Sequence, residues 1–176
     1  MNRLIDLPPD RLTPEQAAIF ERLTAGRGRI LGPYKIWIHA PAVADGMEQI
    51  GTYLNKHSSL SKREVETAII MIAQHWDSPY VRFAHVRDGK AAGLTEAQID
   101  ALLSGGDPGF TDPHERAMHR LAAAAIARKN LPDADFAEVE TVLGRAGIAE
   151  VLVLLGYYSA VAMGMRVHEV PVPAPA

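Results

Sequence analysis

The sequence contains no cysteine among its 176 residues. This absence excludes disulfide bonds, thiolate metal sites, iron–sulfur clusters and catalysis by a protein thiol. A strong charge of one sign is also lacking, because 18 basic and 21 acidic residues give a net charge of -3 and no basic block is present. We therefore do not expect a nucleic-acid partner.

The sequence also lacks a convincing signal peptide or membrane span. The first ten residues contain Asp6 and two prolines where a signal peptide would have an apolar run. The most apolar stretch, residues 148–165, includes Glu150 and two glycines and is short for a bilayer span. We expect this stretch to be a buried core helix, in a cytoplasmic protein with no membrane partner.

Signals for helix ends are frequent, whereas strand patterns are nearly absent. Thr13–Gln16 and Ser61–Glu64 both have the spacing of a capping box. The expected fold is all-α, a single domain over residues 1–176 with a proline-rich tail at 169–176. Helices are predicted over residues 13–25, 42–56, 61–76, 78–93, 95–104, 112–130, 133–146 and 148–168, and residues 28–41 are predicted as a loop or short extended segment.

Glu66 is an unexpected residue in the predicted helix 61–76, whose other positions beyond the first turn are largely apolar. Glu64 is explained as the partner of Ser61 in a capping box. A carboxylate on an apolar helix must be paired, hydrogen-bonded or protonated. A structural ion pair or a solvent-facing strip explains Glu66 as well as a functional site does.

His85 is the second residue of interest, because helical spacing places Ser78, Arg82, His85 and Asp88 at adjacent positions of one face. In this arrangement Asp88 would hold the imidazole, Arg82 would bind a carboxylate, and Tyr80 would donate a hydrogen bond. From spacing alone, the simpler interpretation is a core or interface histidine. Ser78 is better explained as a helix N-cap than as a nucleophile.

From Glu66 onwards the sequence resembles the core of the carboxymuconolactone decarboxylase family, whose superfamily also includes the AhpD-type alkylhydroperoxidases. In the peroxidase branch a glutamate is followed twelve residues later by a Cys-x-x-Cys pair and then by a histidine. Glu66 and His85 match the two outer positions, whereas Ser78 and Val81 stand at the cysteine positions. GPYKIWIHAP and GYYSAVAMGMRVHEVPVP resemble an uncharacterised branch, so the resemblance covers nearly the whole chain.

The resemblance implies an all-helical AhpD-like fold around a central antiparallel helix pair, assembled as a trimer or hexamer with pockets near subunit contacts. It also implies proton transfer by Glu66 and His85. A cysteine-dependent peroxidase reaction is excluded, because Ser78 cannot form the sulfenate and disulfide intermediates. The decarboxylase branch likewise lacks the cysteine pair, needs no cofactor and uses a histidine at this position.

The leading hypothesis is a decarboxylase or lyase, with no cofactor or metal, acting on a small carboxylated lactone or aromatic-catabolism acid. His85 would be the acid, Glu66 would orient it, and the substrate-binding residues would be Arg82, Tyr80, Ser78, Trp37, His39 and Trp76. The alternatives are another proton-transfer or hydrolytic enzyme, or a non-catalytic oligomeric binding protein. An enzyme should bring Glu66 and His85 together at a mostly apolar cavity.

The family resemblance predicts the oligomeric state. Size-exclusion chromatography with light scattering should give a trimer or a larger assembly, because family pockets lie near subunit contacts. A clean monomer at micromolar concentration would contradict both the assembly and a shared pocket.

Overall fold

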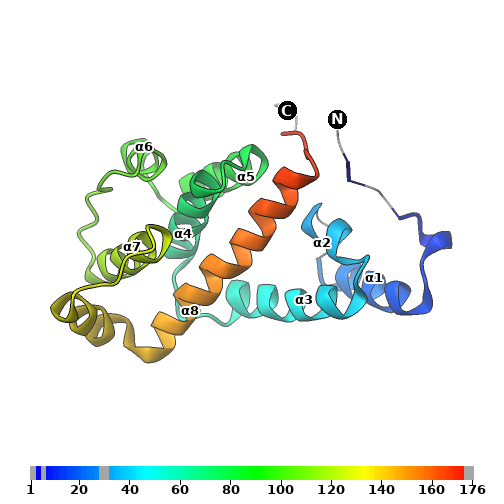
Figure 1. Ribbon diagram of the computed structural model, residues 1–176, viewed down its shortest axis with the longest axis horizontal. Helices are drawn as coiled ribbons and strands as arrows, with labels where there is room; N and C mark the ends of the chain where they lie inside the picture. Colours follow the sequence, from blue (N-terminus) through cyan, green and yellow to red (C-terminus); the bar gives the residue numbers. More distant parts are fainter. Residues whose placement is uncertain (1–2, 5–6, 28–31, 173–176) are drawn as a thin grey trace.

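The computed structural model describes residues 3–4, 7–27 and 32–172. Within these ranges the chain forms helices and no strand (Figure 1), which confirms the all-α prediction. The elements are η1 (Pro9–Arg11), α1 (Pro14–Arg27), α2 (Gly32–Trp37), α3 (Pro41–Lys56), α4 (Lys62–His75), α5 (Pro79–Ala91), α6 (Glu96–Ser104), α7 (Pro113–Ile126) and α8 (Asp133–Val167).

Several predicted elements differ from the observed ones, among them the helix predicted over residues 112–130, which ends at Ile126. α1 continues through Arg27 instead of ending at about Ala25, and α2 forms where a loop or extended segment was predicted. α2 is held in place by buried Tyr34, a tertiary contact that its short local sequence does not reveal. The predicted helices 133–146 and 148–168 are joined in α8, with a kink at Gly144, where φ is 65° and ψ is 171°.

α4 is the central helix, packed against α5, α6, α7 and α8 (Figure 1). Ile69 on one side of α4 belongs to the main core, together with Met118 of α7 and Leu154 of α8. Ile70 on another side joins a second cluster with Leu94 and Ile99. A helix that is apolar around most of its circumference has to be covered on most sides, and α4 meets that requirement.

Glu64 anchors the beginning of α4. Its side chain accepts a hydrogen bond from the Ser61 backbone N–H at 2.8 Å, and the Ser61 hydroxyl accepts one from the Glu64 N–H. The predicted capping box is therefore confirmed. The other carboxylate oxygen of Glu64 pairs with Nδ1 of His114, so the same buried side chain also binds α4 to α7.

α8 is the one described helix that is long and apolar enough to cross a membrane by composition, but 44% of its most apolar window is buried inside the protein. Val151, Leu154 and Ala162 of α8 lie in the main core. In this structure the apolar stretch at 148–165 therefore serves as a core helix.

Glu150 joins α8 to the segment that precedes α4. Its carboxylate accepts hydrogen bonds from the Tyr53 hydroxyl at 2.5 Å, the Ser59 hydroxyl at 2.6 Å, the Ser59 backbone N–H at 2.9 Å and the Ser58 hydroxyl at 3.2 Å. Burial raises the pKa of Glu150, but the hydrogen bonds from Ser59, Tyr53 and Ser58 outweigh it and hold the pKa below its usual range. The charged carboxylate therefore stabilises the fold.

This anchor predicts a pH-dependent stability. Because folding lowers the pKa of Glu150, its contribution is present above the unfolded-state value and is lost as the pH falls through the folded-state value. Glu150→Gln should reduce the free energy of unfolding by roughly 1–3 kcal/mol near pH 7 and by less near pH 3. Urea unfolding at both pH values measures the difference. The charged anchor would be contradicted if Glu150→Gln lost the same unfolding free energy at both pH values. It would also be contradicted if that loss were no larger than the loss in Glu15→Gln, where the glutamate is exposed.

Candidate functional site

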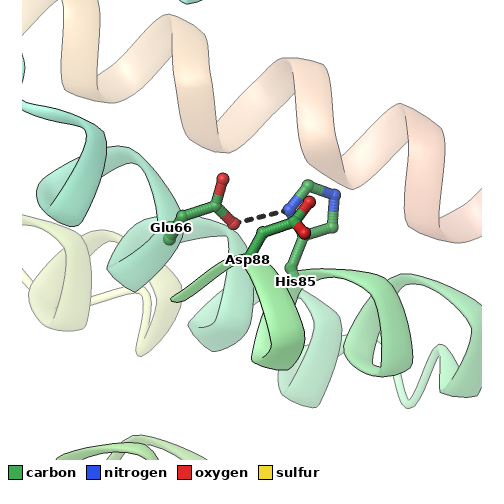
Figure 2. Close-up of side chains that lie close together, drawn as sticks. All are labelled: Glu66, His85 and Asp88. Atoms are coloured by element: carbon green, nitrogen blue, oxygen red, sulfur yellow. Dashed lines mark hydrogen bonds and ion pairs between the residues drawn. The ribbon is translucent and has the colours of Figure 1, made fainter. Parts of the chain in front are cut away.

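Glu66 and His85 meet between α4 and α5 (Figure 2). Oε2 of Glu66 lies 2.7 Å from Nδ1 of His85, and the exposed fractions of the two side chains are 0% and 17%. A carboxylate accepts hydrogen bonds, so Nδ1 carries the proton of this bond. The other ring nitrogen, Nε2, faces away from Glu66 and is left to exchange a proton with a bound molecule.

A close approach of the two helices makes this contact possible. A Cβ atom on Gly89 of α5 would lie 3.0 Å from Cδ1 of Ile70, 3.1 Å from Cδ1 of Leu94 and 3.8 Å from Cβ of Glu66. A side chain at position 89 would therefore press against α4 beside the Glu66–His85 pair. The glycine allows α5 to lie close enough for His85 to reach Glu66.

The second oxygen of Glu66 faces a lysine. Nζ of Lys62 lies 2.6 Å from Oε1 of Glu66, one helical turn earlier on α4. Among the described residues no hydrogen bond of proper geometry reaches this oxygen, so the contact is a close ion pair. Glu66 therefore pairs with His85 through Oε2 and with Lys62 through Oε1. The sequence pattern had suggested Asp88 as the carboxylate that holds His85, and the structure has Glu66 in that place.

His85 borders a cavity of about 410 Å³ between α2, α3, α4, α5 and α8. The lining combines aromatic rings, small apolar side chains and a few charged groups. Such a mixture is typical of a small-molecule site, in which apolar surface binds and a few polar groups orient. The described lining residues are Pro33, Tyr34, Asn55, Lys62, Tyr80, Val81, Phe83, Ala84, His85, Arg87, Asp88, Tyr157, Tyr158 and Val161.

Tyrosines of α8 form an aromatic wall of the cavity. The Tyr158 ring packs edge-to-face on His85, with centroids 5.2 Å apart and an interplanar angle of 83°. The hydroxyls of Tyr157 and Tyr34 are 3.2 Å apart. Gly51 gives Tyr157 room, since a Cβ there would lie 2.5 Å from its hydroxyl. The predicted core helix at residues 148–165 gave no sign that Tyr157 and Tyr158 line a cavity.

The structure brings some predicted residues to the cavity and leaves others outside. Tyr80 lines it together with His85. Arg82 does not, because its guanidinium donates to Gln74 Oε1 at 2.8 Å and to Asp77 Oδ1 at 3.2 Å. The prediction that Arg82 anchors a carboxylate beside His85 is wrong in this structure, because the side chain points back toward the end of α4.

Ser78 is also outside the lining of this cavity, and its side chain is fully buried. It occupies the N-cap position of α5 as predicted, but its hydroxyl makes no capping hydrogen bond and has no partner among the described residues. The sequence therefore identifies Ser78 correctly as the N-cap residue of α5. Its side chain does not make the hydrogen bond that an N-cap serine usually makes. The buried hydroxyl forms no nucleophile–base pair with His85.

The three remaining candidates do not line the cavity. Trp37 supports its wall from behind, packing edge-on against Tyr157 with ring centroids 5.8 Å apart. His39 is exposed in the turn before α3. Trp76 packs on His75, and its backbone carbonyl accepts a hydrogen bond from Arg166 at 2.9 Å.

Glu66, His85 and Asp88 are the one group in the described ranges with three ligand atoms near enough for a metal ion, all within 4.8 Å of one another (Figure 2). Both carboxylates already face cations, since Lys62 pairs with Glu66 and Arg87 pairs with Asp88 at 2.9 Å. The hydrogen bond to Asp88 raises the pKa of Arg87 further, so its charge is permanent. These four side chains balance their charges without a metal ion.

A larger cavity of about 530 Å³ lies between α3 and α8, bordered by Ile50, Tyr53, Glu150 and Val153 among others. Its acidic group is Glu150, whose two oxygens already accept hydrogen bonds from Tyr53, Ser58 and Ser59. No described group there is placed to transfer a proton to a bound molecule. The smaller cavity beside His85 is therefore the candidate site.

Residues 41–125 match the model of the carboxymuconolactone decarboxylase family. This match spans α3 to α7 and includes both Glu66 and His85. The absence of cysteine means that the chain lacks the Cys-x-x-Cys pair of the peroxidase branch. No curated protein sequence matches the chain with significant similarity.

Solved structures share the fold at low sequence identity. A peroxidase-related protein from Silicibacter sp. TM1040 is 17% identical, with a TM-score of 0.72 over 98% of this chain and 93% of the other. The debrominase Bmp8, in a cysteine-to-alanine variant bound to 2,3,4-tribromopyrrole, is 11% identical, with a TM-score of 0.72 over 99% and 92%. A protein of unknown function from Agrobacterium tumefaciens, proposed as an AhpD antioxidant defence protein, is 17% identical, with a TM-score of 0.67 over 80% and 97%. They confirm the AhpD-like fold.

The helix contact at Gly89 yields a stability prediction. Gly89→Ala should lower the free energy of unfolding by about 1–3 kcal/mol, because the new methyl group overpacks the interface with Ile70 and Leu94. Gly156→Ala is the matched control, since Gly156 is exposed in α8 and has open space at its Cβ position. The control should be stabilised by up to ~1 kcal/mol through helix propensity. Denaturant unfolding that ranks Gly89→Ala at or above Gly156→Ala would contradict the tight approach.

Proposed function

We propose that this protein is a cofactor-independent decarboxylase or related lyase acting on a small carboxylated lactone or aromatic-catabolism acid. The main support is the Glu66–His85 hydrogen bond at the edge of a partly aromatic cavity. Glu66 is buried and leaves one ring nitrogen of His85 for proton exchange at the cavity, as general acid–base catalysis requires. The family match adds support for an enzyme scaffold, and the substrate class is the one that the family resemblance implies.

In the proposed reaction the carbon–carbon bond to the substrate carboxylate breaks and carbon dioxide leaves. The bonding electrons remain on the substrate as an enolate or carbanion. The protonated imidazole of His85 transfers the proton on Nε2 to that carbon and becomes neutral, while Nδ1–H stays bonded to Glu66. Water then restores the proton on Nε2. Glu66 keeps its negative charge throughout and stabilises the positive ring before transfer.

A matched pair of histidine variants tests the proposal. Ligands are first found by thermal-shift screening against lactone and aromatic acids, because selective binding to the native state raises apparent stability. With a turned-over ligand, His85→Ala should lower kcat by roughly 100-fold to 10,000-fold, the usual contribution of a general acid. His39→Ala should retain normal turnover, since His39 is exposed and outside the cavity.

Normal kcat in His85→Ala would remove His85 from the mechanism. Binding without turnover for every acid and lactone would support the binding-protein alternative. The hydrolytic alternative receives no structural support, because Ser78 is fully buried and outside the cavity lining.

A further inference from the structure

Two cations border the cavity beside His85, within the described lining. Lys62 comes from the first turn of α4 and Arg87 from α5, so they approach from different helices. Arg87 is held by two guanidinium contacts to Asp88, one from Nε and one from Nη2, each 2.9 Å long. Lys62 is held differently, by a single ion pair to Glu66.

The Lys62–Glu66 pair is strongly asymmetric. The Glu66 side chain is 0% exposed, whereas the Lys62 side chain is 60% exposed. Glu66 is also fixed by its hydrogen bond to His85 at 2.7 Å, while the lysine ammonium ends a flexible four-carbon chain. If one partner of this pair moves, it is therefore Lys62.

We propose that Lys62 is an exchangeable carboxylate-binding group, which pairs with Glu66 in the free protein and with the ligand carboxylate when the cavity is occupied. This inference deepens the proposed function and rests on the same cavity. Glu66 acts as a placeholder that keeps the ammonium at the cavity in the absence of ligand. The lysine thus takes the anchoring role that Arg82, bonded to Gln74 and Asp77, does not fill.

The exchange has a consequence for proton transfer. While Lys62 contacts Glu66, part of the carboxylate charge is neutralised by the ammonium. When the ammonium moves to a ligand, buried Glu66 faces His85 without that partner. The hydrogen bond from Nδ1–H of His85 is then the remaining described contact of that carboxylate, so ligand binding and the Glu66–His85 contact are coupled.

The cavity indicates which anions fit. Its volume of about 410 Å³ and the rings of Tyr157 and Tyr158 suit a planar unsaturated ring. One mobile ammonium suits a singly charged carboxylate, whereas a phosphate needs several converging donors. The expected ligands are aromatic or unsaturated ring monocarboxylates.

Benzoate is a suitable probe, and benzamide is its neutral counterpart. Calorimetric titration of the full chain should show benzoate binding at millimolar concentration or below. Lys62→Met should weaken benzoate binding roughly tenfold or more, the effect of losing a charge-assisted hydrogen bond, and leave benzamide binding unchanged. Lys62→Arg should retain most of the affinity. The control is Lys90→Met, because Lys90 pairs with Glu96 outside the cavity.

Glu66→Gln tests the exchange itself. Removing the competing carboxylate should strengthen benzoate binding several-fold, and this gain should disappear in the Lys62→Met/Glu66→Gln double variant. Circular dichroism confirms that each variant is folded. A gain that persists in the double variant would show simple repulsion by Glu66 and overturn the exchange, as would unchanged affinity in Lys62→Met or no benzoate binding by the wild-type protein.

The two proposals fail in different ways. Lys62-dependent benzoate binding without any turnover of acids or lactones would support the carboxylate site and refute the decarboxylase. Turnover of an acid with kcat/KM unchanged in Lys62→Met would support the decarboxylase and refute the carboxylate site at Lys62.

Discussion

A carboxylate removed from water has to be compensated, and the compensation of Glu66 organises this site. Glu66 is fully buried on the central helix, with His85 on one oxygen and Lys62 on the other. Each partner requires its own support: His85 needs the close helix approach at Gly89, and Lys62 needs the first turn of α4 to face the cavity. Removing His85 would leave the buried carboxylate with the exposed Lys62 as its remaining described partner, which is more costly than losing a surface ion pair. The hydrogen-bonded Glu66–His85 pair therefore lies at the edge of the cavity because of how α4 packs against α5.

The sequence predicted the features that depend on local signals, namely the helix starts and the central helix. The capping boxes at Thr13 and Ser61 mark helix starts, and the apolar stretch after Ser61 indicates a central helix. Glu66 and His85 were selected by motif spacing, and they are in contact. Arg82 does not reach the cavity, and Ser78 takes the predicted N-cap position without a side-chain hydrogen bond. Helical spacing places a residue on a face but does not determine which neighbour its side chain bonds.

Other features could not be predicted because they depend on contacts between distant segments. Tyr157 and Tyr158 reach the cavity because α8 crosses α5, and a tyrosine pair in an apolar helix gives no local sign of that position. The short helix α2 depends on the burial of Tyr34. Lys62 did carry a readable signal, since it stands four residues before Glu66, the spacing at which helical side chains of opposite charge meet.

Glu64 and Glu66 are two residues apart on α4 and make the same kind of bond in different directions. Glu64 binds Nδ1 of His114 on α7, and Glu66 binds Nδ1 of His85 on α5. Successive residues of an α-helix are about 100° apart around the axis, so the two bonds act on sides of the helix separated by about 200°. Together they prevent α4 from rolling about its own axis, because a roll that shortened one bond would stretch the other. The orientation of the Glu66–His85 pair is thus fixed partly from the far side of the helix, by a histidine that lies outside the cavity lining.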